Sequence, residues 1–562
     1  MDRDNPAVSA YTIGLRLGWY GLLAVPLLFL LVFYFYPLAS ILWVSLAPDG
    51  QPDLSSFGRL ILSPYYRETL WFTLWQAVLS TALTIGLALP GAYVFTRYRF
   101  PGKRLLMALT ALPFVLPTVV VAAAFSALVG SNGIINNALE RLFSLETVPI
   151  QLERTLALIL IVHVFYNYTL ALRMITGYWA NQNTRIEEAA RVLGSHGWRL
   201  WWEIRLPALR PVLLAAALLV FIFTFTSFGV ILILGGVRFA TLEVEIYRQT
   251  VNYVNGLPMA AALSLVQIVI MGAALIVYTR LQRRVVVDLQ SAESVARQPR
   301  TRGEKAFVTA TLVVIVVMLF TPLLALVIRS FTGTEGFTTE YYTALGQNSR
   351  NSVLFVPPST AIRNSLLFAL VTTALSVFLG FIAAYLLTRR ARWLDPIFML
   401  PLATSAVTLG FGLFIALDSP PLNLRRSPLL VVIAHTLVAL PFVVRSVVPA
   451  LRSVPAPLRE AAATLGAPPW KVWLWVDLPL ISRGLVVGAT FAFTVSMGEF
   501  GASTFVARPD TPTIPIVIFR LLGQPGAVNY GQGIALSVLL MAVCAVSFVL
   551  IERIRTAGVG EF

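Results

Sequence analysis

The amino-acid sequence predicts an all-α polytopic membrane protein with about twelve transmembrane helices in two parallel six-helix repeats. Three observations support this fold class. The 562 residues are 57% hydrophobic and only 12% charged, whereas a soluble domain averages nearer a quarter charged. Apolar runs of about 20 residues, each long enough to cross a bilayer as a helix, recur along the chain. A polar stretch between these runs occurs twice.

The apolar runs define the expected spans. In the first half we expect helices near residues 20–46, 68–96, 105–129, 154–179, 211–234 and 258–279. In the second half we expect them near residues 306–328, 364–388, 393–417, 428–450, 484–503 and 531–551. The corresponding domains are a first repeat (1–280), a polar, arginine-rich cytoplasmic linker (281–305) and a second repeat (306–562).

The distribution of basic residues orients the chain. With the N-terminus in the cytoplasm, about two thirds of the 42 Lys and Arg residues fall on the cytoplasmic side, as the positive-inside rule requires. Both termini, the linker and both copies of the polar stretch are then cytoplasmic. We attribute the net charge of +16 to this bias, so it predicts contact with membrane lipid and no binding of nucleic acid.

The repeated stretch is the strongest pattern. Glu188-Ala189-Ala190 with Gly194 recurs 272 residues later as Glu460-Ala461-Ala462 with Gly466. The same offset relates further pairs: Pro207 and Pro479, His163 and His435, Arg173 and Arg445. Six crossings per repeat is an even number, so both repeats run in the same direction. The natural arrangement is a pseudo-twofold axis along the membrane normal, with a pathway between the halves.

Local rules predict the shape of each polar loop (184–211 and 456–483). Thr184 and Glu187 fit a capping box that starts a helix. Gly194 and Gly466 suit the left-handed position that ends one. Small and apolar residues recur at helical spacing in both copies, namely Ile186, Ala189, Ala190 and Leu193, then Leu458, Ala461, Ala462 and Leu465.

A single such loop would fit an ordinary amphipathic helix on the membrane surface. Two copies, each followed at the same spacing by an apolar residue, one further residue and Leu-Pro, argue against that interpretation. The pattern E-A-A-x-x-x-G followed by I-x-L-P resembles the signature of membrane subunits of type I ABC importers, which have the MetI-like permease fold. The second copy departs from it only in having Val476 where the first has Ile204. The fused two-copy layout resembles the thiamine and iron(III) importer permeases.

The resemblance implies a role for both loops. Each would be a coupling helix seated in a groove of a cytoplasmic ATPase subunit, with two ATPase copies per chain and an extracytoplasmic solute-binding protein. ATP binding would draw the coupling helices together and open the pathway outward. The implied docking residues are Glu188, Ala189, Ala190, Gly194, Ile204, Leu206, Pro207, Glu460, Ala461, Ala462, Gly466, Val476, Leu478 and Pro479.

The chain lacks the motifs of an ATPase or a metalloenzyme. No G-x-x-x-x-G-K-[ST] occurs, and the Gly102-Lys103 pair is followed by Arg104. Three histidines and one cysteine predict no metal site. We therefore expect a transport subunit in a bacterial cytoplasmic membrane that is not an enzyme and binds no cofactor, with ATP and Mg²⁺ held by partner subunits.

Few acidic residues fall within the spans, and an intramembrane acid is by default a functional hypothesis. Glu499, followed by Phe500, is expected near the outer end of the eleventh span; Ser227 and Phe228 are its repeat partners. These four residues are the candidate pathway. The alternative for Glu499 is a packing role with a neighbouring hydroxyl as partner.

Other polar residues in the spans suit structural roles. We expect His163 and His435 to bond between helices. Arg173 and Arg445 are expected to reach the cytoplasmic interface.

Different residues bear on the solute and on the transporter class. The Thr226-Ser227-Phe228-Gly229 and Gly498-Glu499-Phe500-Gly501 pair resembles thiamine-type permeases more than iron(III) permeases. An iron(III) importer, or an importer of another small solute, is the alternative. A proton-coupled secondary transporter would need a titratable relay within the spans, and an intramembrane enzyme would need a catalytic dyad or metal cluster; the sequence offers neither.

Overall fold

The computed structural model describes residues 21, 23–48, 50–182, 185–236, 238–285, 296–333, 336–347, 354–389, 391–418 and 422–556. In this part of the chain, eleven helices are long and apolar enough to cross a membrane. The count is twelve if Arg392–Ala403 and Ala406–Ala416, which meet at a bend of 91°, form one span. The predicted class, an all-α multi-pass membrane protein of about twelve spans, is confirmed.

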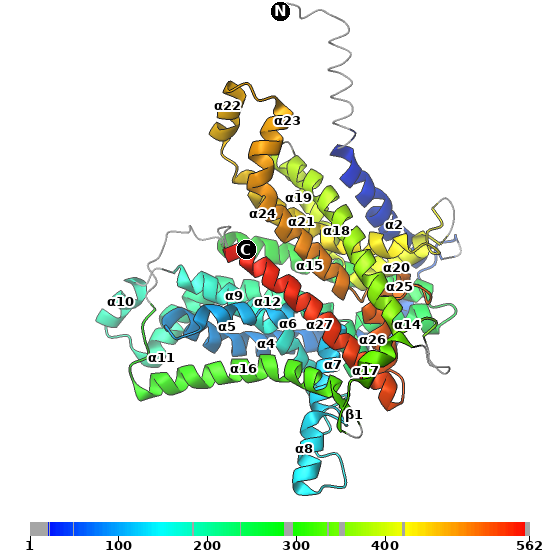
Figure 1. Ribbon diagram of the computed structural model, residues 1–562, viewed down its shortest axis with the longest axis horizontal. Helices are drawn as coiled ribbons and strands as arrows, with labels where there is room; N and C mark the ends of the chain where they lie inside the picture. The colour runs from blue at the N-terminus through cyan, green and yellow to red at the C-terminus, as the bar shows by residue number, and fades with distance from the viewer. Residues whose placement is uncertain are drawn as a thin grey trace, which may run out of the picture. The chain divides into compact units, whose positions relative to one another are not determined.

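The helices form two compact units (Figure 1). Unit 1 comprises Met1–Pro52, Gly346–Val517 and Ala542–Phe562, and unit 2 comprises Asp53–Leu345 and Ile518–Met541. Each unit therefore takes segments from both halves of the sequence. The positions of the predicted repeat boundaries stay a prediction.

Unit 2 is built around three long helices, α4 (Pro64–Arg97), α9 (Leu156–Ala180) and α12 (Leu206–Phe225), which pack on one another. Helix α15 (Leu257–Val285) packs on α12, and α16 (Arg302–Ser330) packs on α7 and α4. The shorter elements are α3 (Ser55–Leu62), α5 (Lys103–Leu109), α6 (Leu112–Val115), α7 (Thr118–Val129), α8 (Ile134–Phe143), α10 (Arg185–Val192), α11 (Gly197–Leu200), η2 (Trp201–Arg205), α13 (Gly229–Leu234), α14 (Leu242–Asn252), the two-stranded β1 (Thr332–Gly333) and β2 (Gly336–Phe337), and α17 (Glu340–Thr343).

Unit 1 repeats this plan with α18 (Pro358–Arg389), α21 (Leu429–Arg452) and α24 (Leu478–Gly498). Its other elements are η1 (Leu31–Phe35), α2 (Tyr36–Leu46), η4 (Arg392–Leu394), α19 (Asp395–Ala403), α20 (Ala406–Ala416), α22 (Ala456–Thr464), α23 (Pro469–Val472), η5 (Trp473–Asp477) and α25 (Ser503–Val506). Three elements have residues in both units: η3 (Ala344–Gly346), α26 (Ile514–Leu522) and α27 (Ala527–Thr556).

The first helix of each half packs with the other half. Helix α2, from the start of the chain, packs on α20, and the buried Tyr34 hydroxyl lies 2.7 Å from Thr404 Oγ1. Helix α16, the first of the second half, belongs to unit 2. The contact between Tyr34 and Thr404 joins residues 370 positions apart. The hydropathy of the sequence does not predict which helices pack together in this way.

Four predicted spans differ from the structure, because apolar composition does not report breaks in a helix. The span at 105–129 is three pieces, α5, α6 and α7, and the span at 393–417 bends between α19 and α20. The span at 211–234 breaks between Phe225 and Gly229, and the span at 484–503 is helical only to Gly498. Prolines lie at two of these breaks: Pro117 is the N-cap of α7, and Pro401 lies near the end of α19.

Small residues allow the central helices of unit 1 to approach closely. A Cβ atom built on Gly380 of α18 would lie 2.6 Å from the side chain of Val443 on α21. One built on Gly484 of α24 would lie 2.6 Å from Ala450 on the same partner helix. Helices in membranes associate through such small residues, because lipid tails supply no hydrophobic driving force between helices.

Candidate functional site

The first polar loop begins with helix α10, and this helix ends just before Gly194 as predicted. Gly194 has φ 88°, the left-handed conformation expected after the last helical residue. The Ser195 N–H donates to the Ala190 carbonyl at 2.9 Å, and the Gly194 N–H donates to the Arg191 carbonyl at 3.0 Å. These bonds satisfy carbonyl groups that the end of the helix leaves free.

The second loop has the same construction. Gly466 has φ 82°, and the Ala467 N–H donates to the Ala462 carbonyl at 3.0 Å. The Gly466 N–H donates to the Ala463 carbonyl at 2.9 Å, and Pro457 lies in the first turn of α22. The two loops therefore share not only residues but also backbone geometry.

Both loops present apolar side chains to solvent. Leu193 is 87% exposed and Leu465, at the equivalent position, is 88% exposed. Glu188, Ala189, Glu460 and Ala461 are also exposed, whereas Ala190 is buried. Exposed apolar patches of this kind mark interaction surfaces. The other large exposed apolar residues described in the two loops are Ile186, Val192, Trp198, Trp202, Leu458, Trp470, Trp473, Leu474, Trp475 and Leu480.

The Leu-Pro end of each motif coincides with a π-helical turn. The Leu206 N–H bonds to the carbonyl of Trp201, and the Leu478 N–H bonds to the carbonyl of Trp473, five residues back in both cases. Proline has no N–H, and its ring clashes with the carbonyl four residues earlier. A π turn just before Pro207 and Pro479 accommodates both restrictions, and such turns frequently occur at functional sites.

An ion pair, which sequence reasoning missed, closes each loop. Arg205 Nη2 lies 3.2 Å from Glu187 Oε2, and the Arg97 guanidinium also donates to that oxygen. In the second loop, Arg459 Nε lies 2.6 Å from Asp477 Oδ1. The signal in the sequence was a pair of opposite charges 18 residues apart in both loops. Of the predicted capping box, Thr184 lies outside the described residues.

A small cavity lies beside each ion pair. The first, of about 140 Å³, is lined by Tyr93, Arg97, Tyr98, Glu187, Glu188, Arg191, Arg205 and Arg297. The second, of about 200 Å³, is lined by Tyr385, Thr388, Leu451, Arg452, Val454, Arg459, Trp473 and Asp477. Burial raises the pKa of the Tyr98 phenol to about 12, so this group is neutral at physiological pH.

The end of the predicted linker reaches the first cavity. The Arg297 N–H donates to the Arg97 carbonyl at 3.0 Å, and the Arg99 N–H donates to the Arg297 carbonyl at 2.9 Å. The Arg297 guanidinium lies over the Tyr98 ring, 5.6 Å from its centroid, and pairs with Glu304. These contacts tie the start of α16 to the end of α4 beside the first loop.

The two histidines bond between helices, as predicted. In unit 2, His163 Nδ1 lies 3.1 Å from Ser80 Oγ on α4, and Nε2 lies 2.8 Å from Ser227 Oγ. In unit 1, His435 Nδ1 lies 2.7 Å from Ser496 Oγ on α24, and Nε2 lies 2.8 Å from Ser503 Oγ. Both rings are buried and use both nitrogens within the protein.

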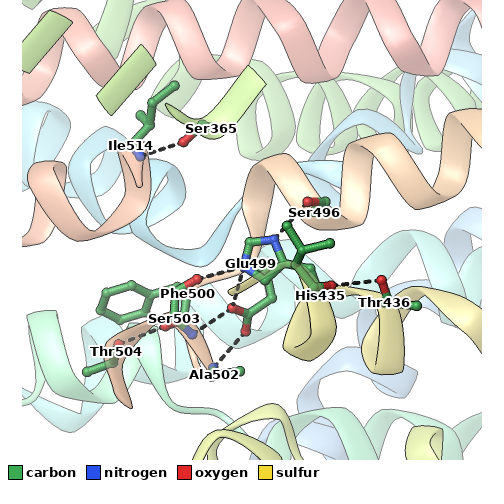
Figure 2. A network of polar contacts seen from close by, with 11 residues as sticks. Ser365, His435, Thr436, Ser496, Glu499, Phe500, Ala502, Ser503, Thr504 and Ile514 are labelled. Atoms are coloured by element: carbon green, nitrogen blue, oxygen red, sulfur yellow. Dashed lines mark hydrogen bonds and ion pairs between the residues drawn. The ribbon is translucent and has the colours of Figure 1, made fainter. Parts of the chain in front are cut away.

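Glu499 directly follows Gly498, the last residue of α24, so the helix predicted at 484–503 ends just before it (Figure 2). Its Oε1 accepts the Ala502 N–H and its Oε2 accepts the Ser503 N–H, each at 2.8 Å. Oε2 also lies 3.4 Å from His435 Nε2. The buried carboxylate thus caps the short helix α25 and lies beside a histidine. The alternative packing role predicted for Glu499 had a hydroxyl group as the partner.

The other candidate pathway residues occupy equivalent breaks. Ser227 lies between α12 and α13, and its carbonyl accepts a bond from Thr241 Oγ1 at 3.3 Å. Ser227, Phe228 and Phe500 are all buried. Assignment of these residues and Glu499 to a pathway stays a prediction.

The two arginines predicted to reach the cytoplasmic interface bond to neighbouring helices. Arg173 Nη2 donates to the Met107 carbonyl at 3.0 Å. Arg445 Nη2 lies 3.3 Å from Asp395 Oδ2. The first contact joins the predicted span 154–179 to the start of span 105–129, and the second joins span 428–450 to the start of span 393–417.

Two further buried acids were missed. Glu243 and Glu245 lie on α14, outside the predicted spans, and are almost fully buried. Glu245 Oε2 accepts from the Tyr65 hydroxyl at 2.8 Å, and its Oε1 accepts from Gln249 Nε2 at 2.8 Å. Gln267 Nε2 donates to Glu243 Oε1. The short Leu-Glu-Val-Glu run carries no hydropathy signal that would have placed it inside the protein.

The chain is similar over most of its length to three proteins named Thiamine transport system permease protein ThiP. It is 26% identical to that of Salmonella typhimurium over 519 residues, 91% of this chain and 92% of the relative. It is 26% identical to that of Escherichia coli over 501 residues, 87% of this chain and 89% of the relative. It is 28% identical to that of Brucella abortus (strain 2308) over 488 residues, 86% of each chain.

The model of one protein family matches the chain twice, at residues 82–287 and 376–556. Each match contains one polar loop, two of the three central helices of one unit in full (α9 and α12, or α21 and α24) and the C-terminal part of the third (α4 or α18). Together the matches cover more than half of the chain, and they confirm the internal repeat. The protein therefore belongs to the family described as the binding-protein-dependent transport system inner membrane component.

Proposed function

We propose that this chain forms the translocation pathway of an ABC importer and docks two copies of a cytoplasmic ATPase through its two polar loops, 184–211 and 456–483. The observation that carries the proposal is the equivalence of the loops. Each ends its helix at a left-handed glycine, exposes one glutamate at the same position, and exposes large apolar side chains around it. Two identical partner subunits require two equivalent surfaces.

The path from the loops to the membrane helices supports a coupling role. Helix α11 continues through η2 into α12, and α23 continues through η5 into α24. In the proposed cycle, ATP closes the paired ATPases, both docking helices move, and α12 and α24 move with them. ATP and Mg²⁺ belong to the ATPase subunits, and this chain supplies no cofactor site of its own.

The proposed orientation places both loops and both termini in the cytoplasm of a bacterial cell, as the positive-inside rule favours. A solute-binding protein delivers the solute at the opposite face of the inner membrane. One copy of the chain, with its fused halves, provides both docking sites, so the proposed assembly holds two ATPase subunits and one binding protein.

We propose thiamine as the solute class. The three relatives described above are named as thiamine permeases and align over most of the chain. The buried Glu499 carboxylate is compatible with a cationic solute, although its oxygens already accept two backbone N–H groups. An iron(III) importer is the second candidate, supported by the general resemblance of the fused two-loop layout.

Solute-stimulated ATP hydrolysis tests both parts of this proposal. The chain is reconstituted in vesicles with its cognate ATPase and binding protein, and hydrolysis is compared with thiamine, with iron(III) and without solute. Stimulation by thiamine alone is the expected result. Stimulation by iron(III) alone would replace the proposed solute, and failure of the ATPase to associate with the chain would overturn the docking assignment.

A further inference from the structure

The ion pairs that close the two loops occupy the same positions with opposite charge. Glu187 and Arg459 are equivalent under the 272-residue offset, and so are Arg205 and Asp477. The acid thus lies on the docking helix α10 in the first loop, and on the π turn η5 in the second. Both loops therefore keep an ion pair at these two positions, but the acidic and the basic residue have changed places.

This exchange argues against direct contact with the ATPases. Two identical ATPase copies would present the same charge to both loops, so a contacting residue needs the same charge in each loop. Glu188 and Glu460 meet this requirement, whereas the Glu187–Arg459 and Arg205–Asp477 positions do not. The common feature of the two pairs is the link within the chain.

Each link joins the docking helix to the base of the next long helix. Arg205 and Asp477 are the last residues of the π turns, directly before Leu-Pro and the start of α12 and α24. The side chains are largely buried: 12% and 6% exposed for Glu187 and Arg205, and 24% and 12% for Arg459 and Asp477. Removing one partner from such a pair leaves a buried charge uncompensated, which strongly favours keeping the pair closed.

We propose that Glu187–Arg205 and Arg459–Asp477 are positioning ion pairs that transmit movement of the docking helices to α12 and α24. This inference rests on the proposed function, because it needs the loops to dock ATPases. The link requires opposite charges at the two positions but not a particular polarity. Residues of the pairs act through the helices that they join and do not contact solute or nucleotide.

The test exchanges the polarity of the second loop. Arg459→Glu and Asp477→Arg are made singly and together in the full chain, purified with the cognate ATPase and reconstituted with the binding protein. Each single variant places like charges together. We expect solute transported per ATP hydrolysed to fall about tenfold in the single variants, within the usual range of coupling between sites. The double variant, which has the polarity of the first loop, should recover to within about twofold of the unaltered chain.

Co-purification separates the possible failures. The single variants should still bind the ATPase, because Glu460 and the exposed apolar surface are unchanged. Loss of ATPase binding by the unaltered chain would refute the proposed function and not the ion-pair link. Single variants that bind ATPase and transport normally would overturn the link, and so would a folded double variant that stays uncoupled.

The first loop supplies a matched control. Arg97 also pairs with Glu187, and Arg191 Nη2 lies 3.9 Å from the same carboxylate oxygen. Exchanging Glu187→Arg with Arg205→Glu would therefore bring Arg97 against a second guanidinium, and this double variant should not recover. If Arg459→Glu fails to accumulate, Arg459→Gln with Asp477→Asn keeps polar side chains without charge. That neutral pair should fold and show reduced coupling, and full coupling would refute the need for charge.

Discussion

Glu499 Oε2 lies 3.4 Å from Nε2 of the buried His435, and the same carboxylate accepts two backbone N–H groups of the turn that begins α25 (Figure 2). In the other half, Ser227 occupies the position of Glu499 and lies 2.8 Å from Nε2 of His163. The histidine link is thus common to both halves, and the additional helix cap is specific to the second.

Glu499→Gln should destabilise the protein. The amide keeps one oxygen acceptor and directs its NH₂ group toward a backbone N–H, so one buried donor loses its partner at a cost of about 1–3 kcal/mol. Thermal unfolding in detergent measures the effect. Ser227→Ala removes one hydroxyl bond and is the matched control, expected at about 1 kcal/mol. Unchanged stability with a raised KM for transport would instead identify Glu499 as a solute contact.

His435→Leu should be more damaging than His163→Leu. The first change removes a contact with a buried carboxylate as well as two hydroxyl bonds, and a hydrogen bond to a charged group is worth about 1.5–3 kcal/mol in addition. The second change removes only hydroxyl bonds, at about 1–3 kcal/mol. Chemical or thermal unfolding of the two variants gives the comparison. Equal losses would show that the Glu499 carboxylate draws no stability from His435.

The glycines that end the docking helices should resist substitution. Gly194 and Gly466 have positive φ, and a Cβ at either position would meet no atom within 4 Å. The penalty of Gly194→Ala or Gly466→Ala is therefore conformational, about 1–2 kcal/mol for a left-handed residue. We expect weaker ATPase binding in a titration, because the helix end that presents Leu193 or Leu465 would fray. Gly177→Ala is the control: it also has open space, but lies within helix α9, where alanine is the better residue. Equal binding by all three variants would contradict the prediction.

Much of the fold could be predicted because it depends on local pattern. Apolar run length gave the number of spans, and the 272-residue offset paired His163 with His435 and Gly194 with Gly466. Helix breaks could not be predicted in the same way, since an interrupted span and a continuous one have similar composition. The packing of η1 and α2 with the second half depends on contacts such as Tyr34 of η1 with Thr404, which are remote in sequence.

The candidate site was predictable to a similar degree. Glu188, Glu460 and the two glycines are visible as a motif. The ion pairs, in contrast, join the last residue of a π turn, 205 or 477, to a residue of α10 or α22. In an alignment of the two loops, Glu187 stands opposite Arg459 and Arg205 opposite Asp477. Such positions look unrelated until the structure shows that each loop forms an ion pair with them. Glu499 was singled out from the sequence as an acid within a predicted span, whereas its use as a cap depends on the break after Gly498.

The docking assignment leads to the most direct prediction. Glu188→Lys combined with Glu460→Lys should abolish association with the ATPase, because both exposed acids are replaced by bases at the same positions of the two loops. The spans should remain folded, since neither carboxylate is buried. Co-purification of the ATPase with the double variant measures the effect, with thermal unfolding of the chain alone as the folding check. Glu203→Lys is the matched control: Glu203 is also exposed, pairs with Arg199 at 2.9 Å, and has Trp475 as its counterpart, so it cannot supply a contact common to both loops. The control should retain the ATPase. Retention by Glu188→Lys with Glu460→Lys as well would show that the apolar surface around Leu193 and Leu465 suffices for docking and that neither glutamate is needed.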